Sequence, residues 1–152
     1  MNTLFTPAEV HKVAFSGEEL IRADIVTHSD VVEAETRYVR PILGEALWEA
    51  IAAGKYALLR SDYVLPAAAA WCRYVVEPLR YVRCAECCGT DRTTADNEHL
   101  RTIVRALRRK ASALSRSLSD HLNSHREEYV EYNPKNNPLN HCSIYGDIIQ
   151  VY

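Results

Sequence analysis

The sequence has few of the residues that form tight turns, with five glycines and six prolines among 152 residues. All-β domains need such residues at many turns, so this scarcity argues against an all-β chain. An excess of charge of either sign is also missing, because the formal net charge is −2. A protein whose whole surface binds nucleic acid is therefore not expected. The remaining composition, 47% hydrophobic and 25% charged, is typical of one globular domain.

Segments that enter membranes are not evident either. The first twelve residues, MNTLFTPAEVHK, lack the basic and apolar regions of a signal peptide. The longest apolar stretch, Tyr63–Cys72, stops at Arg73, far short of the roughly 20 residues that span a bilayer. We expect no membrane partner. The five cysteines are odd in number and, without a secretory signal, are interpreted as reduced thiols.

Motifs of catalysis are missing as well. The sequence contains no G-x-S-x-G, no glycine-rich phosphate loop and no H-E-x-x-H. Ser119, Asp120 and His121 are neighbours in sequence, but neighbours on a helix point in different directions. We expect neither an enzyme nor a cofactor.

Two metal or redox alternatives stay open. Cys84 and Cys87 form a C-x-x-C, and His121 and His125 would share one helix face, so the four could supply zinc ligands. The same C-x-x-C could be a redox pair, although that motif normally opens a helix within a βαβ unit. The favoured interpretation is that the cysteines are small apolar residues closing a helix, with no metal bound.

The pattern of caps and apolar residues predicts an all-α fold, a compact bundle of about four to five helices with an extended C-terminal arm or short strand. Thr6-Pro7-Ala8-Glu9 is a capping box that opens a helix over 7–14. Further helices are expected from Ser29 or Asp30 to Arg40, over 45–53, over 67–82, and over about 95–125 after a cap at Thr93 or Thr94. Pro78 should kink the fourth helix without ending it, and Gly89 should cap the end of that run.

Two of these helices carry long apolar registers, which predicts that they pack together in the core. The first register comprises Ala67, Ala70, Trp71, Tyr74, Val75, Pro78, Leu79 and Val82. The second comprises Leu100, Ile103, Val104, Leu107, Ala111, Leu114, Leu118 and Leu122.

The composition changes after Tyr132, which divides the chain into a helical domain (1–132) and a C-terminal segment (133–152). Four asparagines and two prolines between 133 and 140 predict a linker. Ser143 to Tyr152 is rich in β-branched and aromatic residues, which predicts an extended strand. A lone strand needs a partner, either in its own chain or in a neighbour, and we expect the neighbour. The candidate contact residues are Ile144, Tyr145, Ile148 and Ile149.

Charge is unevenly distributed along the chain. Residues 1–50 carry nine acidic against four basic residues, whereas residues 98–118 carry six basic residues against Glu98. Within the basic helix, Arg101, Arg105, Arg108 and Arg109 lie opposite the leucine stripe. They are candidate subunit-interface or anion-facing residues: a solvated face, a contact with the acidic part of another copy, or a DNA-binding face.

Two stretches carry a resemblance to a known family. Residues 34–51 read AETRYVRPILGEALWEAI, residues 63–79 read YVLPAAAAWCRYVVEPL, and a long apolar-striped helix follows. This order resembles the head–tail connector (adaptor, head-completion) proteins of tailed bacteriophages, particularly forms in phages and prophages of gut bacteria. In that family a helix ending in an LG turn leads to a short helix and then to two longer packed helices. The resemblance covers roughly residues 25–125.

The resemblance implies a structural virion protein, made in the bacterial cytoplasm, that forms a ring of about a dozen copies between portal and tail. It implies portal and tail proteins as partners, and DNA that passes through the lumen without sequence-specific binding. The alternative is a small helical DNA-binding or regulatory protein that uses the basic helix 98–118.

Overall fold

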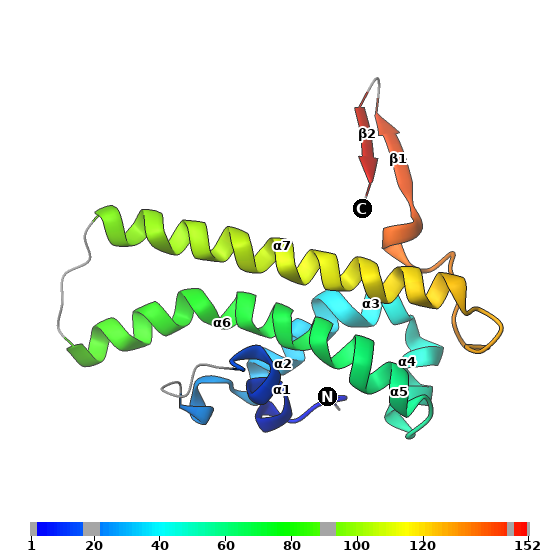
Figure 1. Cartoon of the computed structure of the whole chain (residues 1–152), viewed down its shortest axis with the longest axis horizontal. Helices are drawn as coiled ribbons and strands as arrows, with labels where there is room; N and C mark the ends of the chain where they lie inside the picture. The colour runs from blue at the N-terminus through cyan, green and yellow to red at the C-terminus, as the bar shows by residue number, and fades with distance from the viewer. Residues whose placement is uncertain (1–2, 17–21, 89–93, 146–147, 152) are drawn as a thin grey trace.

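The computed structural model describes residues 3–16, 22–88, 94–145 and 148–151, and it confirms the all-α fold. Two long antiparallel helices, α6 (Leu65–Cys88) and α7 (Thr94–Ser124), form the axis of the molecule (Figure 1). The N-terminal helices cover α6, and α1 (Pro7–Ala14) and α2 (His28–Ala34) pack directly on it. The far ends of α6 and α7, near Cys88 and Thr94, extend beyond these short helices as a two-helix arm (Figure 1).

The N-terminal helices begin at capping boxes. Thr6 and Glu9 form the predicted box of α1, and its bounds agree with the predicted 7–14. A second box, which was not predicted from the sequence, opens α2: the Thr27 hydroxyl accepts from the Asp30 N–H, and the Asp30 carboxylate accepts from the Thr27 N–H. Each box satisfies backbone donors that a helix start would leave unpaired.

The predicted helix ending at Arg40 continues to Leu43. After α2 the chain forms a π-helical segment (Glu35–Val39) and then α3 (Arg40–Leu43). Pro41 does not end the run, because it lies in the first turn of α3, directly after the wider π turn, where a missing N–H costs no helical bond. The run ends at Gly44, whose φ of 75° is in the region that glycine tolerates best. The short helix α4 (Glu45–Ala52) follows, with Leu47, Trp48 and Ile51 buried as expected.

The long helical run around α6 starts earlier than predicted. It begins with α5 (Ala57–Leu59), passes through a second π-helical segment (Arg60–Val64) and continues into α6. Tyr56, at the start of this run, has a left-handed φ of 57°. The helix continues through Pro78 as expected, whereas the predicted cap at Gly89 lies outside the described residues.

The core lies where α6 faces the C-terminal half of α7. The four alanines 67–70 are all buried, and Ala111, Leu118 and Leu122 of α7 are fully buried against the same core. The Trp71 ring stacks on Tyr38 at 3.9 Å, and the Trp71 indole donates to the Ser115 hydroxyl at 2.8 Å. The predicted packing of the two helices is confirmed in this part.

The N-terminal half of α7 is less covered than its apolar register predicted. Its four apolar positions before Ala111 are only half-buried, and Leu79 on α6 is 40% exposed. The physical reason is the two-helix arm: here α6 and α7 lie beyond the N-terminal helices, and two helices alone shield only their facing sides. The half-buried positions of α7 are Leu100, Ile103, Val104 and Leu107. Leu107 is not on the arm itself: it lines a hollow of about 260 Å³ with Val13 and Ala14 of α1, which covers it incompletely.

Residues 133–141, expected to be a linker, lie against α7. The Asn137 side chain is fully buried, and its amide donates to the Ser119 hydroxyl and to the Tyr132 hydroxyl, both at 2.8 Å. Asn140 accepts from the Asn123 amide at 2.8 Å and donates to the Pro134 carbonyl at 2.9 Å. This hydrogen-bond network fixes the segment on the last turns of α7.

The C-terminal residues form a hairpin and not the single strand that was predicted. β1 (Cys142–Tyr145) pairs antiparallel with β2 (Ile148–Val151), with Ile144 opposite Ile149 and Tyr145 opposite Ile148. The strand therefore finds its partner within its own segment. The hairpin projects away from the helices (Figure 1). None of the described helices is long and apolar enough to cross a membrane.

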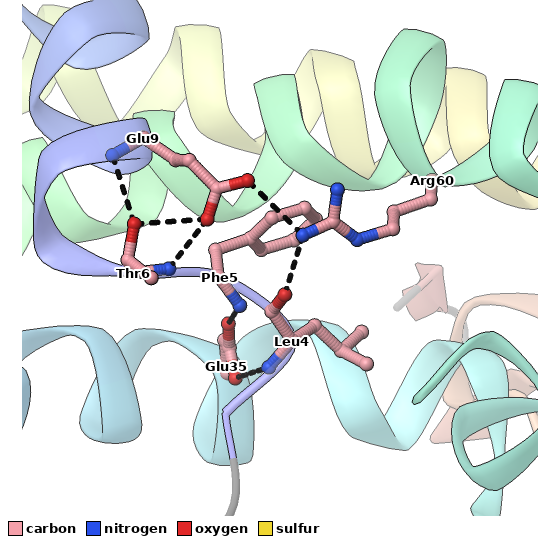
Figure 2. Close-up of polar contacts among 6 residues, drawn as sticks. All are labelled: Leu4, Phe5, Thr6, Glu9, Glu35 and Arg60. Atoms are coloured by element: carbon pink, nitrogen blue, oxygen red, sulfur yellow. Dashed lines mark hydrogen bonds and ion pairs between the residues drawn. The ribbon is translucent and has the colours of Figure 1, made fainter. Parts of the chain in front are cut away.

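The segment before α1 is held by a buried carboxylate. Glu35, 1% exposed, accepts hydrogen bonds from the Leu4 and Phe5 N–H groups, both at 3.0 Å (Figure 2). From the other side, Arg60 donates to the Leu4 carbonyl at 2.7 Å and to Glu9 at 3.2 Å. Glu35 and Arg60 are the first residues of the two π-helical segments, so these segments together hold the N-terminal segment in place.

We expect Glu35 to make stability depend on pH. Burial raises the pKa of Glu35 to about 7, in spite of the two N–H donors that lower it. Because the folded-state pKa lies above the ordinary value of 4.5, its stabilising contribution is complete below about pH 4.5 and is lost as pH rises through 7. The unfolding free energy of Glu35→Gln, minus that of the wild type, should increase by about 1–3 kcal/mol between pH 5 and 7.5.

Denaturant titrations at several pH values would measure this difference. His121, whose pKa is lowered by burial first and by His125 second, acts in the opposite direction, but it is present in both proteins and cancels. Glu49→Gln, the same substitution at an exposed carboxylate, is the control. Its unfolding free energy minus that of the wild type should not change with pH. If the difference in unfolding free energy between Glu35→Gln and the wild type does not change with pH, the Glu35 carboxyl stays ionised in the folded protein.

Candidate anion-binding surface

Five arginines of α7 form one exposed strip. Successive residues of a helix are about 100° apart, which places these five within a sector of about 100°. The side chains are all exposed, and the sector lies to one side of the buried face that contains Ala111 and Leu118. We call this surface the arginine strip, and its members are Arg101, Arg105, Arg108, Arg109 and Arg116.

A groove of about 450 Å³ borders the C-terminal half of the strip. Arg108 and Arg116 of the strip and Arg37 of the first π-helical segment line it, with Ser112 between the two strip arginines. Four different parts of the chain meet here. The other lining residues are Tyr38, Pro41, Ile42, Trp71, Ser115, Pro138 and Leu139.

The packing below the groove keeps its wall rigid. Tyr38 stacks on Trp71, and Trp71 is anchored to Ser115 by its indole N–H. Burial raises the pKa of Tyr38, with a smaller opposing effect from Arg37. The Arg37 guanidinium lies 5.4 Å from the centre of the Tyr38 ring, within the range of a cation–π contact.

The cations of the groove are weakly neutralised by the chain itself. Arg37 forms an exposed ion pair with Glu33 at 3.4 Å, a kind of contact that contributes little. Arg108 and Arg116 form no ion pair within the part of the chain that the structure describes. A second hollow of about 630 Å³ lies beside Arg108, Arg109 and Arg116, and Asp120 also lines it. The surface therefore suits an anion.

The hairpin is the other surface predicted from the sequence. Its four candidate contact residues, Ile144, Tyr145, Ile148 and Ile149, occupy the two pairs nearest the turn. The structure brings these four together, because each lies opposite another one across the hairpin.

The possible zinc ligands are not brought together. Cys84 and Cys87 lie near the end of α6 that is next to the start of α7, whereas His121 and His125 lie at the opposite end of α7. The histidines belong to an aromatic cluster: His121 stacks on Tyr63 at 4.0 Å, and its Nε2 lies 3.0 Å from the Tyr129 hydroxyl. Among the residues whose side chains are described, no three potential metal ligands gather.

Sequence reasoning identified four of the strip arginines but missed the two residues that complete the groove. Arg116 lies eight residues after Arg108 and could have been found from helical spacing alone. Arg37 lies about 70 residues away in the sequence, and only the packing of the π-helical segment beside α7 places it at the groove. No local pattern indicates that approach.

Searches of protein-family models, of curated proteins and of solved structures found no match to this chain.

Proposed function

We propose that this protein is a structural component of a tailed phage, a head–tail connector or head-completion adaptor that assembles into a ring between portal and tail. The observation that carries the proposal is the order of helices. A helical run ends at Leu43-Gly44, the short α4 follows, and α6 and α7 then form a long antiparallel pair. This is the order on which the resemblance to connector proteins rests.

The two-helix arm supports assembly with other copies. On this arm, Leu79 of α6 is 40% exposed, and three apolar residues of α7, Leu100, Ile103 and Val104, are only half-buried. Apolar residues grouped on one protruding element gain free energy when a second molecule covers them. The projecting hairpin offers a second contact, since its outer strand edge can add to a neighbour through backbone hydrogen bonds.

Contacts of this kind favour a closed ring. A contact between two different surfaces of the same chain generates a ring when the rotation between copies closes. The arm and the hairpin lie at separate places on the molecule, so each can meet a different part of a neighbour (Figure 1).

Mass photometry and negative-stain electron microscopy of the purified chain test the proposal. We expect the wild type to form rings as its concentration rises, without added DNA. Leu79→Glu should prevent assembly, because it places a charge in the apolar contact. Leu58→Glu is the matched control: Leu58 is 78% exposed on α5, away from the arm, and its replacement should leave the rings intact. A wild type that stays monomeric at every concentration would refute the ring.

The alternative is a DNA-binding regulatory protein, which the exposed arginine strip favours. A regulator must prefer one DNA sequence over others, and such preference comes from contacts to base edges. Sequence-selective binding by a monomer that does not assemble would support this alternative over the connector.

A further inference from the structure

The arginine strip has the dimensions of a site for an extended polyanion. From Arg101 to Arg116 it spans about 22 Å along α7, at a rise of about 1.5 Å per residue. Arg101, Arg105 and Arg109 repeat every fourth residue, which places their Cα atoms about 6 Å apart along the helix. A single carboxylate or phosphate would occupy only one part of such a strip, whereas a chain of repeated negative charges could follow all of it.

The composition of the strip distinguishes between classes of partner. Protein–protein interfaces have apolar centres that are depleted of charged residues. The strip instead consists of arginines with Ser112 among them, and the apolar residues of α7 lie on other faces of the helix. Interfaces with nucleic acid are more polar and much more positively charged than those with protein. The strip therefore matches a phosphate backbone better than an acidic protein surface.

The groove provides an anchoring point for one phosphate of that backbone. Arg37, Arg108 and Arg116 line the same hollow, and Ser112 lines it with them. A guanidinium offers several N–H donors in a fixed planar arrangement that suits phosphate oxygens. Since Arg37 comes from a helical segment other than α7, a phosphate in the groove would be contacted from two sides.

We propose that the arginine strip, together with Arg37, binds the phosphate backbone of duplex DNA without sequence specificity. The proposal concerns the surface of a single chain and does not require a ring. Phosphate contacts fix the position of a protein on DNA but do not read its sequence. Affinity should therefore be nearly the same for different sequences and should fall steeply as salt rises, because bound counterions are released.

Fluorescence anisotropy with a labelled duplex of arbitrary sequence tests this proposal. For the wild-type chain, the logarithm of affinity should decrease linearly with the logarithm of NaCl concentration. Replacing Arg105, Arg108 and Arg109 by alanine should make this slope shallower by about 2.7, or about 0.9 for each phosphate that is no longer neutralised, and should weaken binding at about 50 mM NaCl at least tenfold. Alanine favours helix, so α7 should stay folded, which circular dichroism would verify.

The control variant removes the same charge elsewhere. Lys12, Arg126 and Lys135 are exposed and lie off the strip, so replacing all three by alanine should leave the salt slope nearly unchanged. Equal losses of affinity in both triple variants would overturn the proposal, because only net charge would then matter. An absence of wild-type binding at low salt would also overturn it, as would equally tight binding of a glutamate-rich peptide. Measuring assembly of both variants by mass photometry separates a failure here from a failure of the ring.

Discussion

Replacing Trp71 by alanine should lower the free energy of unfolding by about 3–5 kcal/mol, the usual cost of removing a buried aromatic side chain. Trp71 is 7% exposed, stacks on Tyr38, meets Tyr74 edge-on at 5.5 Å and donates to Ser115. The substitution removes all of these interactions and leaves a cavity between α6 and α7. Denaturant unfolding followed by circular dichroism would measure the loss of stability.

Trp71→Phe provides the control, because it keeps an aromatic ring and removes mainly the hydrogen bond to Ser115. It should cost clearly less than alanine. An unfolding midpoint that does not move in Trp71→Ala would refute the packing of α6 on α7.

Two leucines of α7 that the apolar register predicts to be equally buried differ in burial in the structure. Leu118 is fully buried, whereas Leu107 is half-buried beside α1, where it lines a hollow of about 260 Å³ with Val13 and Ala14. Leu118→Ala should therefore cost about 2–5 kcal/mol, and Leu107→Ala should cost less in a monomer. The apolar register of α7 predicted equal burial, because spacing identifies the inward face but not which part of that face another element covers.

The second large effect concerns where the chain can be shortened. Deleting residues 142–152 removes the hairpin alone and should change the unfolding free energy by less than about 0.5 kcal/mol, while weakening assembly. Deleting residues 133–152 also removes Asn137 and Asn140, whose side chains bond to Ser119, Asn123 and Tyr132. This longer deletion should cost roughly 2–4 kcal/mol, at about 1 kcal/mol for each hydrogen bond removed. Denaturant unfolding of both proteins measures the difference.

A pair of point variants isolates the cause. Asn137→Ala removes a fully buried amide, which should account for much of the destabilisation, whereas Asn136→Ala changes an exposed neighbour and should be nearly neutral. Equal stability of the two deletions would show that residues 133–141 do not contribute to the fold. A large destabilisation on deleting 142–152 alone would instead show that the hairpin belongs to the core.

The sequence predicted those helices whose ends are marked by residues close to them in the chain. The capping box at Thr6 and Glu9 set the start of α1, the helix predicted over 45–53 agrees with α4 to within one residue, and the apolar register predicted α7 to within about one residue of its ends. Caps, glycines and periodicity act over one or two helical turns, so they can be interpreted without knowing the rest of the fold. Gly146-Asp147 was also such a signal, since a two-residue glycine-containing turn predicts a hairpin where a single strand was expected.

The sequence by itself determined that the chain is helical, which face of α6 and α7 is apolar, and that α7 carries a basic face. Tertiary structure decided the rest. It placed Arg37 beside Arg108 and Arg116, buried Glu35 beneath the first residues, and docked Asn137 on α7. These contacts join residues 18 to about 80 positions apart, and they depend on how far a helix is covered and on two π-helical turns that rotate its side chains. No local sequence pattern indicates how far a helix is covered or where a π-helical turn forms, because both arise only when the helices pack.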